Sequence, residues 1–233
     1  AANAQTNVTL DSSLVAVSFE QNGLDTGVTG TPSLTSSNNF INFCETVPTT
    51  PISDGTGILG GSCNPTPMGQ IPPIANMPLV HILQPANGAT LAANVPISLS
   101  FVVSNLHAGV SVNTATNYMS APQQLDPTGD ILGNLHVVIE ELDALNSTVP
   151  MDNQQYVFFR VVEDAPEQGI IQSSVPDGIP EGFYRVTVMT RAANHQPVIV
   201  PISEHGSLND VAYVGGFNLR FESFLFIYSQ RSP

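Results

Sequence analysis

The chain contains no lysine and no tryptophan, and its 233 residues include only five arginines against 19 aspartates and glutamates. With histidine counted as neutral, the net charge is 5 − 19 = −14 at pH 7. Proteins that bind the phosphates of nucleic acids need a cationic surface, and anionic membranes attract the same kind of surface. The composition therefore argues against nucleic acids and anionic membranes as partners.

Long apolar runs are also missing, because no window approaches the roughly 18 consecutive apolar residues of a membrane helix. The first five residues, 1–5, are small and polar, with neither a charged segment nor an apolar one, so we interpret them as a mature terminus exposed after signal-peptide removal, although a cytosolic protein would also lack those segments. Intrinsic disorder is excluded, since 42% of the residues are hydrophobic and only 10% are charged. We expect a folded protein that does not insert into a membrane.

Cysteine is scarce, with only Cys44 and Cys63 in the chain. Both lie in a stretch rich in glycine, proline and threonine, where a disulfide would hold a long loop; two unpaired buried thiols are the alternative. The sequence also contains two N-glycosylation sequons, at Asn7 and Asn146. A disulfide, two sequons and an acidic chain without lysine together predict a secreted protein.

Apolar and β-branched segments that alternate with polar residues dominate the middle of the chain and predict strands. The expected strands are residues 79–83, 97–103, 135–142, 156–162, 182–190, 198–200 and 211–214. Helical patterns are short, and residues 167–172 are expected to form at most one turn. This pattern predicts an all-β fold of the immunoglobulin-like or fibronectin-like β-sandwich type.

Three regions are expected along the chain. Residues 1–76 combine one or two strands within 7–20 with a long extension rich in proline and glycine, which we expect to wrap the surface. Residues 77–214 form the predicted sandwich, and residues 215–233 form an apolar C-terminal strand or tail.

Three of the five histidines suggest a metal site. His136 lies within a predicted strand, and His195 and His205 lie in two successive loops. Imidazoles that converge from a strand and two loops could bind copper or zinc. The alternative is that these side chains fix the loops by hydrogen bonds, since no H-x-H or H-x-x-x-H spacing occurs among them.

Signals for other catalysis are weak. No G-x-S-x-G elbow surrounds any serine. The adjacent carboxylates Glu140 and Glu141 point to opposite faces of a strand and do not pair with each other. The sequence therefore predicts no catalytic residues.

Five segments carry a resemblance to a known family: residues 64–72, 116–125, 136–140, 193–198 and 205–210. Together they resemble a family of secreted fungal proteins, common in mushrooms and often mislabelled as ribosomal protein S17. The resemblance spans roughly residues 40–214 and implies a fungal source and secretion, with no activity to carry over. His136, His195 and His205 all fall within these motifs, whereas Asn134 stands where such proteins carry a further histidine.

The C-terminal tail suggests a second kind of function. Its apolar side chains are Phe217, Leu219, Phe221, Phe224 and Phe226. Such a strand either completes its own sheet or is donated to a neighbouring molecule, with residues 8–19 as an alternative donor. We therefore expect a non-catalytic structural protein that associates with itself or with cell-wall components outside the cell. The alternative is a metal-binding secreted protein, or a copper-dependent oxidative enzyme.

Overall fold

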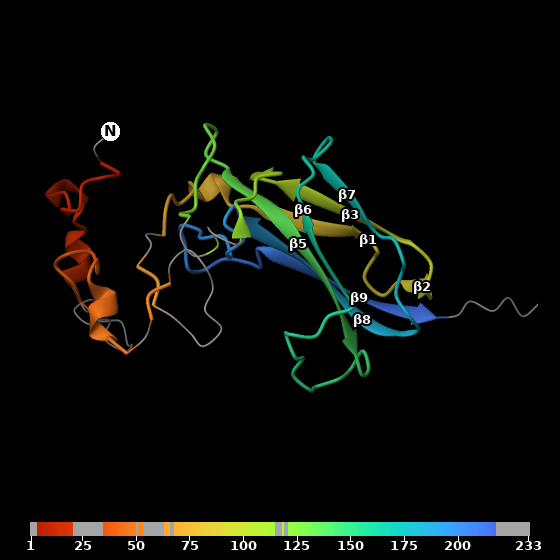
Figure 1. The fold of residues 1–233 in the computed structure, drawn as a ribbon. Coiled ribbons are helices and arrows are strands. Elements are labelled where there is room, and N and C mark those ends of the chain that lie inside the picture. Colours follow the sequence, from red (N-terminus) through yellow and green to blue (C-terminus); the bar gives the residue numbers. More distant parts are fainter. Residues whose placement is uncertain are drawn as a thin grey trace, which may run out of the picture. The chain divides into compact units, whose positions relative to one another are not determined.

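The computed structural model of the protein describes residues 4–20, 35–49, 51–53, 63–65, 68–114, 118 and 121–217 (Figure 1). The chain divides into two compact units. One comprises residues 1–67 and 115–121, and the other residues 68–114 and 122–233. Strands dominate the described residues, and the helices are short 3-10 turns, so the predicted all-β class is confirmed.

The larger unit contains all the named strands. They are β1 (Leu79–Gln84), β2 (Thr90–Ala92), β3 (Ile97–Ser104), β4 (Leu106–Ala108), β5 (Ile131–Leu142), β6 (Phe158–Val162), β7 (Ile170–Val175), β8 (Gly182–Ala192) and β9 (Asn209–Phe217). A 3-10 turn, η4 (Ile74–Asn76), precedes β1.

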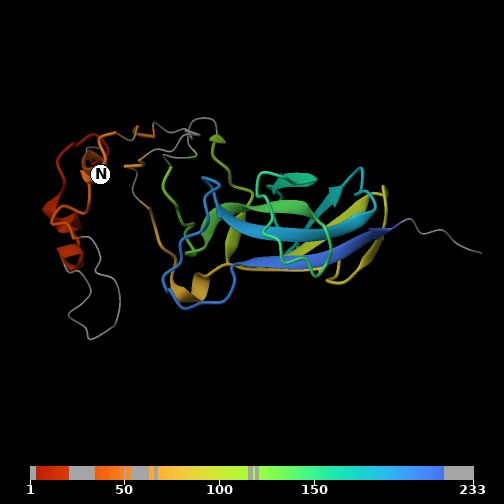
Figure 2. The ribbon, with the colours of Figure 1, turned by 90° about the horizontal axis from the view of Figure 1, so that it is seen from below.

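These strands form two sheets. The smaller sheet has the order β1-β3-β7 and is antiparallel throughout. The larger has the order β2-β9-β8-β5-β4, with β6 also paired to β5. The start of β5 pairs in parallel with β4, and its middle pairs antiparallel with β6. The long strands β5, β8 and β9 run side by side through this sheet (Figure 2).

Alternation along β5 and β8 separates a buried inner face from an outer face. Leu135, Val137 and Ile139 of β5 are fully buried, as are Val186 and Val188 of β8. These side chains join Leu99, Phe101 and Ile171 of the smaller sheet in one hydrophobic cluster. The two sheets therefore share a single core. This shared core determines which side chains of the larger sheet point outward.

The smaller unit corrects one expectation and confirms another. Residues 7–20, expected as strands, form two 3-10 turns, η1 (Ser12–Leu14) and η2 (Val17–Glu20). The physical reason is a cap, because the Asp11 carboxylate accepts hydrogen bonds from the backbone N–H and hydroxyl of Ser13 at 2.9 and 2.7 Å. A third turn, η3 (Phe43–Thr46), contains Cys44, which forms the expected disulfide with Cys63.

Two further expectations are wrong. Residues 167–172 do not form a helical turn, because Glu167 and Ile170 form a bridge and β7 begins at Ile170. Residues 198–200 form no strand, and the backbone N–H of Ile199 donates to the Gln123 side-chain oxygen at 2.9 Å. The backbone of Ile199 thus pairs with a side chain, and not with the neighbouring strand that the apolar pattern suggested.

Candidate functional site

The outer face of the larger sheet carries an unusual mixture of side chains. Asn134, His136 and Glu140 of β5 lie opposite Arg191, Met189 and Arg185 of β8 in the antiparallel register. Five polar or titratable side chains and one methionine thus stand in two adjacent rows on the outer face of this sheet. We regard this face as the candidate functional site.

His136 and His195 are in direct contact. The Nε2 atom of His136 lies 3.0 Å from the Nδ1 atom of His195, and both residues are buried, at 9% and 8% exposure. The ring of Phe159 on β6 packs edge-on against His136, with ring centroids 5.3 Å apart. Burial lowers the pKa of His136 to about 4, and the charges of Arg191 and His195 act in the same direction. The His136 imidazole is therefore neutral at pH 7.

A tight turn after β8 carries His195 to this position. The His195 backbone N–H donates to the Ala192 carbonyl at 2.7 Å, and the Ala192 N–H donates to the Gln196 carbonyl at 3.1 Å. His195 has a φ of 65°, in the left-handed region that few residues other than glycine adopt. A strained conformation that directs a side chain to a specific partner is a common property of functional positions.

His205 does not take part in this contact. It is exposed, and its Nδ1 atom lies 2.6 Å from the Gly206 carbonyl oxygen. Within the part of the chain that the structure describes, no group of three or more histidine, cysteine, aspartate or glutamate side chains could hold a metal ion. The structure thus brings together two of the three histidines expected as ligands.

The remaining two histidines hydrogen-bond to carboxylates elsewhere in the larger unit. The Nδ1 atom of His81 lies 2.8 Å from Asp210, and that of His107 lies 2.9 Å from Asp126. The hydrogen bond from His107, together with one from the Thr128 hydroxyl, holds the pKa of Asp126 well below its usual range. These contacts join β1 to β9 and β4 to the turn that begins at Asp126.

Glu140 and Arg185 form an ion pair on the same face. The Arg185 Nε and Nη2 atoms donate to the two carboxylate oxygens of Glu140 at 2.9 and 3.0 Å. The Glu140 side chain is 10% exposed and that of Arg185 is 33% exposed. This paired geometry orients both side chains and balances the charge of Arg185. Glu141 points to the opposite side of β5 from Glu140, as the alternation predicts, and is exposed near the end of the strand.

A groove of about 500 Å³ opens beside this ion pair. Its walls are Arg185, Tyr213 and the connection between β5 and β6. Tyr156, which lines the groove two residues before β6, is 57% exposed, and Phe159 of β6 is 44% exposed. The groove has mixed polarity, since Glu141, Asp143 and Asp152 line it together with Tyr156 and Val157, and its aromatic side lies next to β6.

The other expected positions lie away from this face. Asn7 and Asn146 are both exposed, as glycosylated asparagines must be. Phe217 is the last residue of β9 and packs against Phe183, with ring centroids 5.7 Å apart, so it belongs to its own sheet. Leu219, Phe221, Phe224 and Phe226 lie outside the described residues.

Sequence reasoning missed Met189 and Arg185. Met189 lies opposite His136, and its sulfur accepts a hydrogen bond from Arg191 at 2.9 Å. Nothing in the sequence gives the register that pairs these residues. For Arg185 a signal was present, since a lone arginine interrupts the most strongly predicted strand of a chain with only five cationic residues.

Comparisons with known proteins place the chain among fungal proteins. The family described as the CLU5d N-terminal domain matches residues 80–215, which include the whole outer face described above. Pathogenicity cluster 5 protein d of Colletotrichum graminicola is 39% identical over 176 residues, covering 74% of this chain and 36% of that protein. The chain thus spans about a third of the length of this relative, whose fungal origin fits the expected source. No helix among the described residues is long and apolar enough to cross a membrane. The chain belongs to the CLU5d N-terminal domain family.

Proposed function

We propose that this chain is an extracellular, non-catalytic module that associates with further copies of itself through the β6 edge of its larger sheet. The observation that carries the proposal is that β6 pairs only with β5 among the described strands. An edge strand presents backbone N–H and C=O groups that a strand from another molecule can pair with. Most proteins protect such an edge with charges, whereas β6 carries one arginine, Arg160, among four apolar residues.

Exposed apolar side chains next to this edge would add to the binding energy. Tyr156, Val157 and Phe159 are each more than two-fifths exposed. Burial of apolar surface contributes roughly 25 cal/mol per Å², so three such side chains can supply several kcal/mol on association. Backbone pairing together with side-chain burial is the usual energetic basis of strand addition.

The proposed donor is the segment that follows β9. Leu219, Phe221, Phe224 and Phe226 give it the apolar character of a strand, and 233 − 217 = 16 residues follow the last residue of β9. Sixteen extended residues span about 50 Å, enough to reach the edge of a second copy. Cell-wall components remain the alternative partner for the same surface.

An extracellular location is supported by two features of the smaller unit and one of the larger. The Cys44–Cys63 disulfide is typical of oxidising compartments. The sequon asparagines Asn7 and Asn146 are exposed and accessible to glycosylation. Proteins from the culture medium of the fungus should therefore include this chain, with a mass that falls on treatment with an N-glycosidase.

Light scattering coupled to size-exclusion chromatography tests the association. We expect the full chain to form larger species as its concentration rises, and a chain ending at Phe217 to stay monomeric. Phe159→Asp should have the same effect, because it places a charge on the acceptor edge. Leu79→Asp is the matched control, since Leu79 is 62% exposed on the other sheet. A monomeric full chain at all concentrations, or an equal loss in the control, would refute the proposal.

We also infer that the larger unit is an immunoglobulin-like sandwich, as its sequence suggested. The support is Tyr184, the third residue of β8, whose hydroxyl donates to the Pro180 carbonyl at 3.2 Å. A tyrosine near the start of a strand that bonds to the backbone a few residues upstream is a hallmark of immunoglobulin-like domains. The two sheets and their shared core are compatible with this assignment.

Tyr184→Phe tests the contribution of this contact. Loss of the hydrogen bond should lower the free energy of unfolding by about 1 kcal/mol at pH 7. Burial, with a smaller contribution from Glu141, raises the pKa of Tyr184. The folded state therefore holds this proton more tightly than the unfolded state, and stability should fall as the pH rises above about 10. Urea unfolding at pH 7 and between pH 9 and 11 should show a smaller alkaline loss in Tyr184→Phe; an identical loss would contradict the prediction.

A further inference from the structure

We propose that His136 Nε2, His195 Nδ1 and the thioether sulfur of Met189 bind one copper(I) ion on the outer face of the larger sheet. This proposal does not depend on self-association, and it replaces His205 with Met189 in the ligand set expected from the sequence.

The first argument is the facing pair of ring nitrogens. Two nitrogens bound to one metal at about 2.0 Å in trigonal geometry are about 3.5 Å apart. The observed separation of Nε2 and Nδ1 is 3.0 Å, so the rings need to part by only about half an ångström. His136 and His195 lie 59 residues apart in the sequence, and the contact is made by the fold. The two nitrogens are therefore already positioned as a chelating pair.

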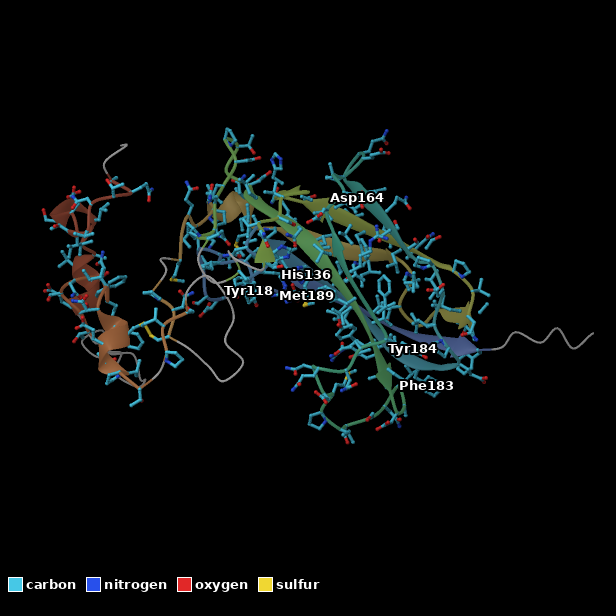
Figure 3. All side chains as sticks on the ribbon, viewed as in Figure 1. Tyr118, His136, Asp164, Phe183, Tyr184 and Met189 are labelled. Carbon is cyan, nitrogen blue, oxygen red and sulfur yellow. A yellow bond between two sulfur atoms is a disulfide. The ribbon has the colours of Figure 1, made fainter. Side chains whose placement is uncertain are left out.

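The second argument is the position of Met189. Met189 is the register partner of His136, so both side chains leave the same face of neighbouring strands (Figure 3). Side chains directly opposite each other in an antiparallel pair have Cβ atoms about 4.5–5.5 Å apart. A flexible thioether at that position can reach a metal held by the histidine. Met189 thus supplies the third ligand that the two histidines lack.

The third argument concerns which metal these ligands prefer. Two neutral imidazoles and a thioether form a soft, uncharged set, which favours copper(I) over zinc or magnesium. The Arg191 guanidinium lies 2.9 Å from the Met189 sulfur and adds a positive charge to the site. Repulsion from that charge is about twice as large for a divalent as for a monovalent ion. Charge and softness therefore both favour copper(I), whose binding would displace the Arg191 hydrogen bond.

The surroundings suit such an ion. His136 and His195 are more than nine-tenths buried, and the Phe159 ring packs edge-on against His136. A hydrophobic shell limits the access of water to a metal and controls its reactivity. Asn134 follows the same face of β5 and is fully buried, and its side-chain oxygen has no hydrogen-bond partner among the described residues. The polar atoms at this end of the face are therefore not fully satisfied by the protein alone.

Anaerobic titration of the full chain with copper(I), in competition with a coloured copper(I) chelator, tests the site. We expect one tightly held ion per chain, and at least a 100-fold loss of affinity in His136→Ala or His195→Ala. Met189→Leu keeps the volume of the side chain and should weaken copper(I) binding at least tenfold. His205→Ala is the matched control and should bind as the unchanged protein does.

X-ray absorption at the copper edge identifies the atoms bound to copper directly. This readout does not depend on whether a substitution also affects folding. The unchanged protein should show one sulfur neighbour of copper, and Met189→Leu should lose it while keeping two nitrogen neighbours. The proposal is overturned if the chain does not compete with the chelator, if no sulfur neighbour is present, or if His205→Ala loses as much affinity as His195→Ala. Tighter binding of zinc than of copper(I), unaffected by Met189→Leu, would also overturn it.

Discussion

Replacing Arg185 with alanine is expected to lower the free energy of unfolding by about 3 kcal/mol, because it leaves the Glu140 carboxylate buried without its partner. The Glu140 side chain is only 10% exposed, and both of its oxygens accept hydrogen bonds from Arg185. A buried carboxylate that loses its partner keeps the cost of leaving water and loses the compensating interaction.

The reverse replacement should cost less. In Glu140→Ala the remaining Arg185 side chain is 33% exposed and can turn its guanidinium toward water. We expect a loss of about 1 kcal/mol in this variant. The asymmetry follows from the unequal burial of the two partners, because a simple surface ion pair would lose the same small amount from either side.

Urea unfolding measures the free energy of unfolding of both single variants. The same measurement is made on a double variant that carries Glu140→Leu and Arg185→Met. An apolar pair that replaces a buried ion pair is often close to neutral, so the double variant should be more stable than Arg185→Ala alone. Equal losses in the two single variants would show that Glu140 is solvated, contrary to its position in the structure. Thr187→Ala, two residues along β8 on the same outer face, serves as a control and should change stability by less than about 1 kcal/mol.

The ion pair also bears on the function of the outer face. Arg185 lines the groove beside β6 and is held in place by Glu140. In Arg185→Ala the groove loses a wall that an ordered side chain now forms. Association through the β6 edge should therefore weaken in this variant, even under conditions where the protein remains folded.

The strands of the larger unit were predictable where one face of the strand is apolar and the other is polar. The pattern of residues 182–190 alternates between apolar and polar, and β8 spans Gly182–Ala192 with that alternation preserved as burial. β2 and β4 were missed because three-residue strands contain too few residues to show a period of two. Both are held by parallel pairing to a distant strand, which no local pattern records.

The expectation of strands in residues 7–20 shows the opposite error. Val8, Leu10 and all of residues 14–19 except Ser18 are apolar, yet a single aspartate cap at Asp11 redirects the backbone into a 3-10 turn. Alternating apolar residues form a strand only when a partner strand is available. The nearby aromatic contact of Phe19 with Phe40 uses the apolar residues without a sheet.

The candidate site was predictable only in part, because its geometry also depends on how distant strands pair. His136 and His195 were identified because histidine is rare and chemically distinctive. Their contact depends on the length of β8 and on the turn after Ala192, which place His195 beside the middle of β5. The participation of Met189 depends on the register of β5 with β8. The register between strands is set by the side chains on the core face of the sheet. The residues on the outer face therefore do not reveal which of them lie opposite each other.

The second large effect is expected at the centre of the core. Phe101 of β3 is fully buried and lies between Ile82 of β1 and Ile171 of β7 in the cross-strand register. It is part of the cluster to which both sheets contribute. Phe101→Ala should lower the free energy of unfolding by about 3–5 kcal/mol, through lost burial and the cavity that remains.

The neighbouring position provides the matched control. Val102 is 37% exposed on the opposite face of β3, so Val102→Ala should change the free energy of unfolding by less than about 1 kcal/mol. Phe101→Leu refills much of the space and should cost about 1–2 kcal/mol. Chemical unfolding monitored by circular dichroism measures the free energy of unfolding of each of these variants. A loss in Val102→Ala as large as that in Phe101→Ala would mean that both faces of β3 are buried, and that a further element covers the smaller sheet.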